Sequence, residues 1–272
     1  MVTQEQRKRQ LAREKFLRQQ QRRTSARRKA RMRNAVIASV LGVVVIGSLA
    51  LYTTGVLKDD DKKADASPQT TPSAAPSAAK DPCEKPAAGS VKKQTWKKEP
   101  AVTIDASAKY TMTLATTCGD IDIALKAKAA PHTVNSFDFL AGKGFFDHTK
   151  CHRLTTNGIY VLQCGDPTGS GSGGPGYTIP DENLKDASLK ANVYPAGTVA
   201  MANTGQPHTG GSQFFLVYQD SQLPPSYTPF GTMSADGMKV LKKIAAAGEN
   251  TGGGDGAPNA TVVIDKATVT KS

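Results

Sequence analysis

Residues 197–218 read GTVAMANTGQPHTGGSQFFLVY, which is the pattern of two β-strands joined by a glycine-rich turn. Before the turn, Val199 and Met201 fall on one face of a strand, and after it Phe215 and Val217 do the same. The turn is rich in asparagine, glutamine, threonine and serine, and its glycines disfavour a helix. We expect a β-hairpin with an apolar floor and hydrogen-bonding groups at its rim. An ordinary hairpin with a solvated turn would have the same pattern.

A second pair of short segments lies about fifty residues earlier in the chain. Residues 151–154 read CHRL, and after a short turn residues 160–168 read YVLQCGDPT and run into a glycine-rich stretch. These segments resemble the arginine-bearing hairpin of the cyclophilins, a β-barrel family of peptidyl-prolyl cis-trans isomerases. Residues 201–203 (MAN) and 211–215 (GSQFF) resemble the second active-site hairpin of that family. Because both motifs occur in the right order, residues 102–272 are identified as a cyclophilin-like domain.

The resemblance implies a mainly β fold, a closed eight-stranded antiparallel β-barrel capped by two helices. Local patterns in the sequence agree with it. Alternating apolar residues predict a first hairpin from strands at 110–114 and 120–125, and a last strand at 261–269. Proline in a first turn predicts a helix over about 130–141, and apolar spacing predicts another over 235–247.

The resemblance also implies the residues of an active site. It assigns Arg153 as a hydrogen-bond donor to the prolyl nitrogen, with Gln163 and Gln213 as polar groups that orient it and the substrate. Two more residues separate Arg153 from Gln163 than in common cyclophilins, so Tyr160 is assigned by counting back from Gln163. The proline pocket and the peptide-binding rim would comprise Tyr160, Val161, Ala202, Asn203, Phe215, Leu223 and Tyr227.

Rotation about an X-Pro bond breaks no covalent bond and transfers no proton, so we expect no cofactor and no metal. The sequence has no Cys-x-x-Cys pair, and its four histidines lack ligand spacing with the cysteines. It also lacks the ending of a phosphate-binding loop and the Gly-x-Ser-x-Gly elbow of many hydrolases. The polar residues of the two hairpins are therefore the best candidates for the chemistry.

The positive charge of the chain lies near its N-terminus. Residues 1–33 contain thirteen Lys and Arg against Glu5 and Glu14, a local balance of +11 within a total of +12. The remaining chain is close to neutral, so the composition does not indicate a nucleic-acid-binding surface on the folded domain. A basic cytoplasmic arm that orients a membrane segment explains this charge best.

Residues 34–57 carry no charge and would form a helix of about 36 Å, longer than the ~30 Å hydrocarbon core of a bilayer. Arg and Lys crowd its N-terminal side, so we expect a single transmembrane helix with a cytoplasmic N-terminus and an extracytoplasmic domain. A cleaved signal peptide is the alternative, but its apolar core usually runs only about 7–15 residues. We expect an uncleaved anchor in the cell membrane.

Residues 58–101 are rich in proline, alanine, serine and lysine, and little in them could form a core. We expect a disordered linker that holds the domain away from the membrane. Trp96 in this segment is either exposed or the point where the domain meets its N-terminal extension.

Four cysteines, an even number, lie in the part of the chain expected outside the membrane, which predicts two disulfides with three possible pairings. The resemblance favours Cys151 with Cys164, which would face each other across the arginine-bearing hairpin. Cys83 would then link the N-terminal extension to Cys118.

Two functions of different classes stay open. An isomerase would accelerate X-Pro rotation in polypeptides that fold outside the membrane, whereas a binding module or holdase would hold proline-containing segments with little turnover. Arg153, Gln163, Gln213 and Phe215 together favour the enzyme, because a binder needs no donor at the prolyl nitrogen. We expect a monomer that binds proline-containing polypeptides, with no nucleic acid on the folded domain.

Overall fold

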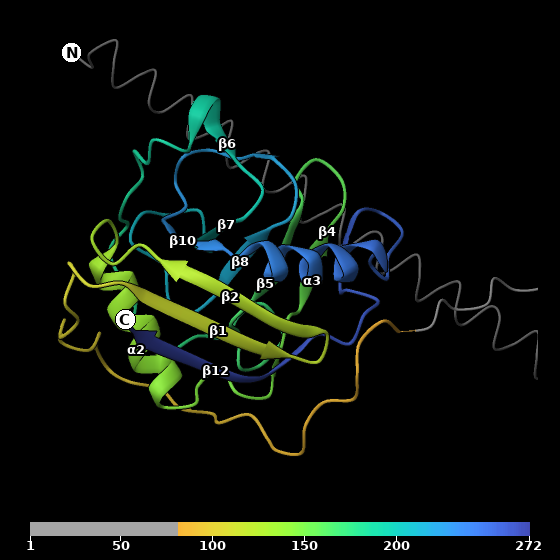
Figure 1. Cartoon of the computed structure of the whole chain (residues 1–272), viewed down its shortest axis with the longest axis horizontal. Coiled ribbons are helices and arrows are strands. Elements are labelled where there is room, and N and C mark those ends of the chain that lie inside the picture. The colour runs from red at the N-terminus through yellow and green to blue at the C-terminus, as the bar shows by residue number, and fades with distance from the viewer. Residues whose placement is uncertain (1–80) are drawn as a thin grey trace, which may run out of the picture. The chain divides into compact units, whose positions relative to one another are not determined.

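The computed structural model describes residues 81–272 (Figure 1). The basic arm, the apolar segment 34–57 and the linker up to residue 80 lie outside the described residues. Within residues 81–272, none of the helices has the length and apolarity needed to cross a bilayer. The membrane anchor therefore stays a prediction from the sequence.

The described part of the chain is mainly β, with the helices α2 (Pro131–Gly142) and α3 (Ala235–Ala246) and a 3-10 helix, η1 (Lys190–Asn192). One antiparallel sheet has the strand order β11-β4-β5-β8-β7-β10-β2-β1-β12-β3, and β6 pairs separately with β9. The strands are β1 (Tyr110–Thr116), β2 (Gly119–Leu125), β3 (Thr149–Lys150), β4 (Arg153–Thr155), β5 (Val161–Cys164), β6 (Val193–Tyr194), β7 (Thr198–Met201), β8 (Phe214–Val217), β9 (Ser221–Gln222), β10 (Pro229–Met233), β11 (Asp255–Gly256) and β12 (Val263–Lys271).

The large sheet curls, but within the described residues its two edge strands, β11 and β3, do not pair with each other (Figure 1). The chain itself joins the two sides, because Cys151 and His152 connect β3 at one edge to β4 near the other. The amide of Cys151 donates to the carbonyl of Val262 at 2.9 Å, and that of His152 donates to the carbonyl of Gln163 at 3.0 Å. The expectation of an eight-stranded barrel closed by strand pairing therefore needs correction, because the large sheet has ten strands in the described residues and its two edges do not pair. The chain bends at residues 151–152, so that β3 pairs with β12 while β4 pairs with β5 and β11.

Phenylalanine rings fill the interior of the curled sheet. The rings of Phe146, Phe214 and Phe230 lie 5.2, 5.5 and 4.5 Å from the ring of Phe137, which α2 contributes. All four side chains are fully buried. Burial of a side chain of this size stabilises a fold by about 1.5–3 kcal/mol, so α2 is held mainly by its apolar face.

The hairpin of residues 197–218 forms as predicted, with Val199 of β7 opposite Leu216 of β8. Every residue of both strands is buried, so neither face is solvated. Val199 and Met201 belong to the interior cluster, whereas Ala200 and Phe215 belong to a second, smaller cluster on the other face. This second cluster forms the floor of the site described below.

Both helices lie close to their predicted positions, and each has an acceptor for its first amides. In α2 the amides of His132 and Thr133 donate to the carboxylate of Glu182 at 3.0 and 2.9 Å. In α3 the hydroxyl of Ser234 accepts from the amide of Gly237 at 3.0 Å. Helix N-termini require such acceptors. Because Glu182 comes from a distant loop, it also attaches that loop to α2.

Both predicted disulfides are present, Cys151 with Cys164 and Cys83 with Cys118. Residues 81–101, which we call the strap, lie along the domain and not in a free linker (orange in Figure 1). Next to its disulfide, the amide of Glu84 donates to the carbonyl of Thr117 at 2.8 Å. The disulfide and these backbone bonds order a segment whose composition alone predicts disorder.

The strap is also held further along by an aromatic side chain. The ring of Trp96 packs edge-on against Phe139 of α2, with ring centroids 5.1 Å apart, and lies 6.0 Å from Phe145. Trp96 is therefore a second point where the domain meets its N-terminal extension, in agreement with one of the two roles considered for it.

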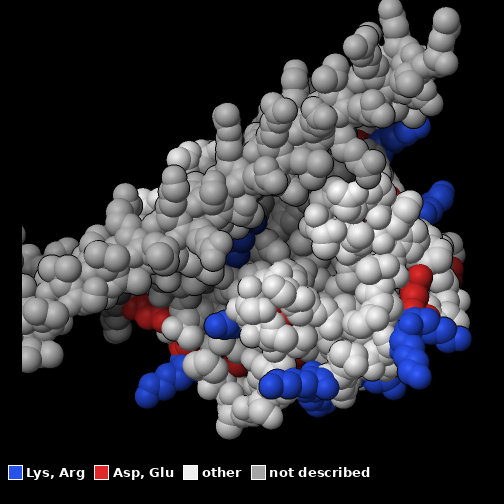
Figure 2. Space-filling view, turned by 180° about the vertical axis from the view of Figure 1, so that it is seen from behind, with Lys and Arg blue, Asp and Glu red and all other residues white. Residues whose placement is uncertain are grey.

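Charged side chains on the domain are mixed in sign. On the coloured and white surface of Figure 2, Lys and Arg side chains are scattered, with Asp and Glu among them. Lys271 pairs with Asp105 at 3.2 Å and Lys239 with Asp236 at 2.8 Å. This surface agrees with a nearly neutral domain, and the expectation that the domain binds no nucleic acid stays a prediction.

Candidate active site

Three polar side chains proposed from the sequence form one hydrogen-bonded chain. Nη1 of Arg153 donates to Oε1 of Gln163 at 3.1 Å, and Nε2 of Gln163 donates to Oε1 of Gln213 at 2.8 Å. Nε2 of Gln213 donates onward to the carbonyl of Gly173 at 2.9 Å. Arg153 and Gln163 are directly opposite in the β4–β5 ladder, and Gln163 is opposite Phe215 in the next one. The strand register therefore brings these side chains together.

Asp255 on β11 is a fourth residue of this hydrogen-bonded network, and the sequence did not predict it. Its carboxylate accepts from Nε of Arg153 at 2.7 Å and from Nη2 at 2.9 Å. Hydrogen bonding to Asp255 raises the pKa of Arg153, although burial opposes this. A guanidinium has five N–H groups, and Asp255 and Gln163 together accept from three. No local signal marks Asp255, which lies 102 residues after Arg153.

An apolar pocket of about 100 Å³ opens beside the guanidinium. Its volume is that of a few water molecules, which suits a small ring better than a long side chain. The ring of Phe215 lies in its floor, and the ring of Tyr227 stands edge-on to it with centroids 5.5 Å apart. The residues that line it are Arg153, Ile159, Val161, Gln163, Ala202, Asn203, Phe215, Leu223 and Tyr227.

The pocket contains most of the residues proposed from the sequence. Gln213 lies beside it, bonded to Gln163. The structure places these side chains together, and their roles in catalysis and binding stay predictions.

Tyr160, in contrast, does not line the pocket. Its ring stands edge-on to Tyr218, with centroids 5.8 Å apart, and its amide donates to Oγ of Ser221 at 2.9 Å. Ile159 occupies the expected place, next to Val161. Side chains two residues apart share one face of a strand, so alternation from Val161 selects Ile159. Counting back from Gln163 along the family pattern missed this because the turn is longer here.

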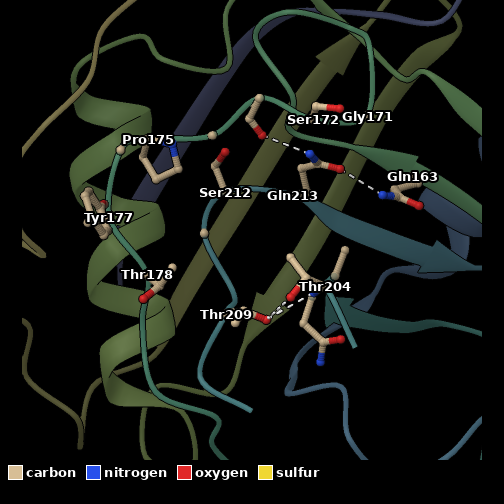
Figure 3. Close-up of a pocket in the computed structure, with 16 residues that line it drawn as sticks. Gln163, Gly171, Ser172, Pro175, Tyr177, Thr178, Thr204, Thr209, Ser212 and Gln213 are labelled. Atoms are coloured by element: carbon tan, nitrogen blue, oxygen red, sulfur yellow. Dashed lines mark hydrogen bonds between the residues drawn. The ribbon is translucent and has the colours of Figure 1, made fainter. Parts of the chain in front are cut away.

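A larger cavity of about 860 Å³ adjoins the apolar pocket (Figure 3). Gln163, Ala202 and Asn203 line both cavities, so together they form one groove. The glycine-rich segment 171–178 lines one side of the larger cavity and residues 211–213 line another. Figure 3 shows the side chain of Gln213 bonded to the glycine-rich segment on one side and to Gln163 on the other. A peptide with its proline in the apolar pocket would extend into this larger cavity.

The glycine-rich wall is organised by a buried carboxylate. The amides of Thr168 and Gly171 donate to Asp166 at 2.7 and 2.6 Å. Burial by itself would raise the pKa of Asp166, but hydrogen bonds from Gly173, Thr168 and Gly171 lower it to about 2. Asp166 is therefore ionised at neutral pH. It orders a stretch, residues 169–176, in which five glycines would otherwise allow many conformations.

His152 precedes Arg153, and both of its ring nitrogens are buried without a hydrogen-bond partner among the described residues. Burial lowers the pKa of His152, the charge of Asp166 opposes this, and the charge of Arg153 lowers the pKa further. The imidazole therefore favours its neutral form, and Arg153 carries the positive charge beside the pocket.

A curled antiparallel sheet with two helices and an arginine beside an apolar, peptide-sized groove defines the class of the cyclophilin-fold prolyl isomerases. The sequence profile of the family described as "Cyclophilin type peptidyl-prolyl cis-trans isomerase/CLD" matches residues 111–269. The chain belongs to this family.

Named relatives agree with this assignment. The "Probable peptidyl-prolyl cis-trans isomerase B" of Mycobacterium leprae (strain TN) is 53% identical over 166 residues, which cover 58% of this chain and 56% of the relative. The protein of that name in Mycobacterium tuberculosis (strain ATCC 25618 / H37Rv) is 51% identical over 165 residues, covering 58% and 53%. The match thus spans little more than half the length of either mycobacterial relative.

Similarity extends to a shorter bacterial protein and to a solved structure. The "Peptidyl-prolyl cis-trans isomerase B" of Bacillus subtilis (strain 168) is 38% identical over 126 residues, covering 46% of this chain and 82% of the relative. A crystal structure of a cyclophilin type peptidyl-prolyl cis-trans isomerase from Cryptosporidium parvum superposes with a TM-score of 0.50 at 26% identity. That comparison covers 60% of this chain and 99% of the other.

Proposed function

We propose that this protein is a peptidyl-prolyl cis-trans isomerase that accelerates X-Pro rotation in polypeptides outside the cytoplasmic membrane. The observation that carries the proposal is the guanidinium of Arg153, held beside an apolar pocket by Asp255 and Gln163. A site that only binds proline has no need of a charged donor in this position.

The reaction has a high barrier but requires no covalent step. Partial double-bond character gives the prolyl peptide bond a rotation barrier of about 18–20 kcal/mol, and uncatalysed exchange takes tens of seconds. In the twisted transition state the conjugation is lost and the nitrogen regains its lone pair, so the amide is less dipolar than in its planar form. An apolar pocket therefore favours the twisted form over the planar one.

Arg153 supplies the second part of the mechanism. Two N–H groups of its guanidinium remain after the bonds to Asp255 and Gln163, and one of them donates to the new lone pair of the prolyl nitrogen. This bond is stronger in the transition state than in the ground state, which is the condition for catalysis. Lowering the barrier by about 7 kcal/mol would accelerate rotation by about five decades.

Two features support a site of action outside the membrane. Disulfides persist in oxidising compartments, and all four cysteines are paired in the two disulfides. The apolar segment 34–57 with its basic flank predicts that the domain lies on the outer side. The substrates would then be secreted or surface-exposed polypeptides.

A protease-coupled isomerisation assay on the full chain tests the proposal. The expected result is accelerated release of a reporter from a peptide that the protease cleaves only with a trans X-Pro bond. Peptide binding without acceleration would instead favour the binding module or holdase.

A further inference from the structure

We propose that the strap, through Trp96, holds the glycine-rich wall of the groove and so determines how tightly the protein binds the residues that precede proline. The inference deepens the proposed function, because it concerns the same groove. Its first support is a direct bond, since the amide of Trp96 donates to the carbonyl of Pro175 at 2.8 Å. Pro175 lines the larger cavity.

The strap and the wall approach closely at the next residue. Gly176 has a φ of +88°, and a Cβ atom built on it would lie 2.8 Å from the carbonyl oxygen of Trp96 and 3.1 Å from Cβ of Thr95. Only glycine fits there without displacement of the strap. Residues 95–96 therefore lie directly against the outer side of the wall.

The wall has anchors on both sides. On the inner side, Nε2 of Gln213 donates to the carbonyl of Gly173, and the hydroxyls of Tyr177 and Ser136 of α2 lie 2.8 Å apart. On the outer side lies the bond from Trp96. The wall, residues 171–178, contains four glycines and has a large conformational entropy to lose, so each anchor contributes to its order.

Trp96 can act as an outer anchor because its own position is determined elsewhere. Its indole packs against Phe139 and Phe145. Three residues after Trp96, the carboxylate of Glu99 lies 2.7 Å from Nδ1 of His132. These contacts belong to the α2 side of the domain and not to the groove. Loss of the indole would therefore free the strap from α2 and remove the outer anchor of the wall, while the bonds of Gly173 and Tyr177 remain.

The proline ring would occupy the apolar pocket, and the residues before proline would pass Ala202 and Asn203, which line both cavities, and enter the larger cavity. A loosened wall must be reordered when a peptide binds, and this cost weakens binding. The cost falls on peptides that reach the wall. It does not fall on a short peptide that begins at the residue before proline.

The experiment uses the full chain with Trp96→Ala, Trp96→Phe and Val102→Ala. Trp96→Phe keeps an aromatic ring against Phe139, and Val102, which is 46% exposed, is a matched control near the strap. Each variant is assayed with a short peptide and with one extended by several residues before proline, and binding of both is measured by calorimetry. Hydrogen exchange of residues 171–178 reports directly on the wall.

For Trp96→Ala we expect the KM and Kd of the extended peptide to rise about five-fold or more, with kcat and the short peptide unchanged. Amides in 171–178 should exchange faster, and Trp96→Phe should restore most of the difference. Equal losses for both peptides, or unchanged exchange in the wall, would overturn the inference. A wild-type chain without isomerase activity would refute the proposed function alone, because the binding difference between the peptides would still test the strap.

Discussion

The proposed reaction depends on the guanidinium of Arg153. Arg153→Ala should lower kcat/KM by about 100-fold or more, which corresponds to about 3 kcal/mol of transition-state stabilisation. Arg153→Lys should restore little, because an ammonium lacks the planar fork that contacts Asp255 and Gln163 together. Assays on variants with unchanged circular dichroism measure this. Wild-type turnover in a folded Arg153→Ala protein would remove Arg153 from the mechanism.

The carboxylate of Asp255 positions this guanidinium. Replacing Asp255 tests how much the orientation of Arg153 contributes to catalysis while Arg153 keeps its positive charge. Asp255→Asn keeps the size of the side chain but loses the bidentate ion pair, so kcat should fall about ten-fold with little change in KM. Asp236→Asn, which breaks an exposed ion pair on α3, should leave kcat unchanged. A rise in kcat for Asp255→Asn would contradict this role, because it would show that the ion pair with Asp255 makes Arg153 a weaker donor to the substrate.

At the scale of secondary-structure elements, Asp166 links the end of β5 to the glycine-rich wall. Its folded pKa of about 2 lies below the ordinary value of 3.8, so its contribution to stability is complete above pH 3.8 and is lost as the pH falls through 2. Asp166→Asn should lower the free energy of unfolding at pH 7 by about 2 kcal/mol and flatten its decline in acid. Urea unfolding at several pH values measures both, with the exposed Asp120→Asn as control. Parallel pH profiles for the wild type and Asp166→Asn would contradict this role.

A disulfide between Cys151 and Cys164, thirteen residues apart, links the two sides of the arginine-bearing hairpin. Replacing both by alanine should destabilise the domain by about 3 kcal/mol, because a loop of this length then regains its freedom in the unfolded chain. Arg153 lies two residues after Cys151, and Gln163 directly precedes Cys164, so kcat should fall as well. Peptide mapping without reduction should find the two cysteines linked. Free thiols at both positions in the mature protein would rule out this disulfide.

At the scale of the whole molecule, the prediction concerns topology. A single uncleaved helix over residues 34–57 places residues 1–33 in the cytoplasm and the domain outside. Protease added to intact cells stripped of outer barriers should release the domain and spare the basic arm. Antibodies against the two ends of the chain measure this. A soluble protein whose N-terminus begins just after residue 57 would favour the cleaved signal peptide.

The sequence alone determined the features that depend on neighbours along the chain. The alternation around Val199 and Phe215 predicted the β7–β8 hairpin, and Pro131 and Gly142 predicted the limits of α2. The family resemblance added Arg153, Gln163 and Gln213 and, through the arginine-bearing hairpin, the pairing of Cys151 with Cys164. All of these lie in short motifs, where backbone preference and the spacing of apolar residues carry the information.

Only the tertiary structure decided which distant segments meet. Asp255 contacts Arg153 because β11 pairs with β4, although the two residues are 102 positions apart. The local sequence around either residue does not predict the other as its partner. The strap is ordered because Trp96 packs against Phe139 and Cys83 forms a disulfide with Cys118. Composition records how little apolar area a segment has, but not whether the rest of the fold offers a surface to bury it.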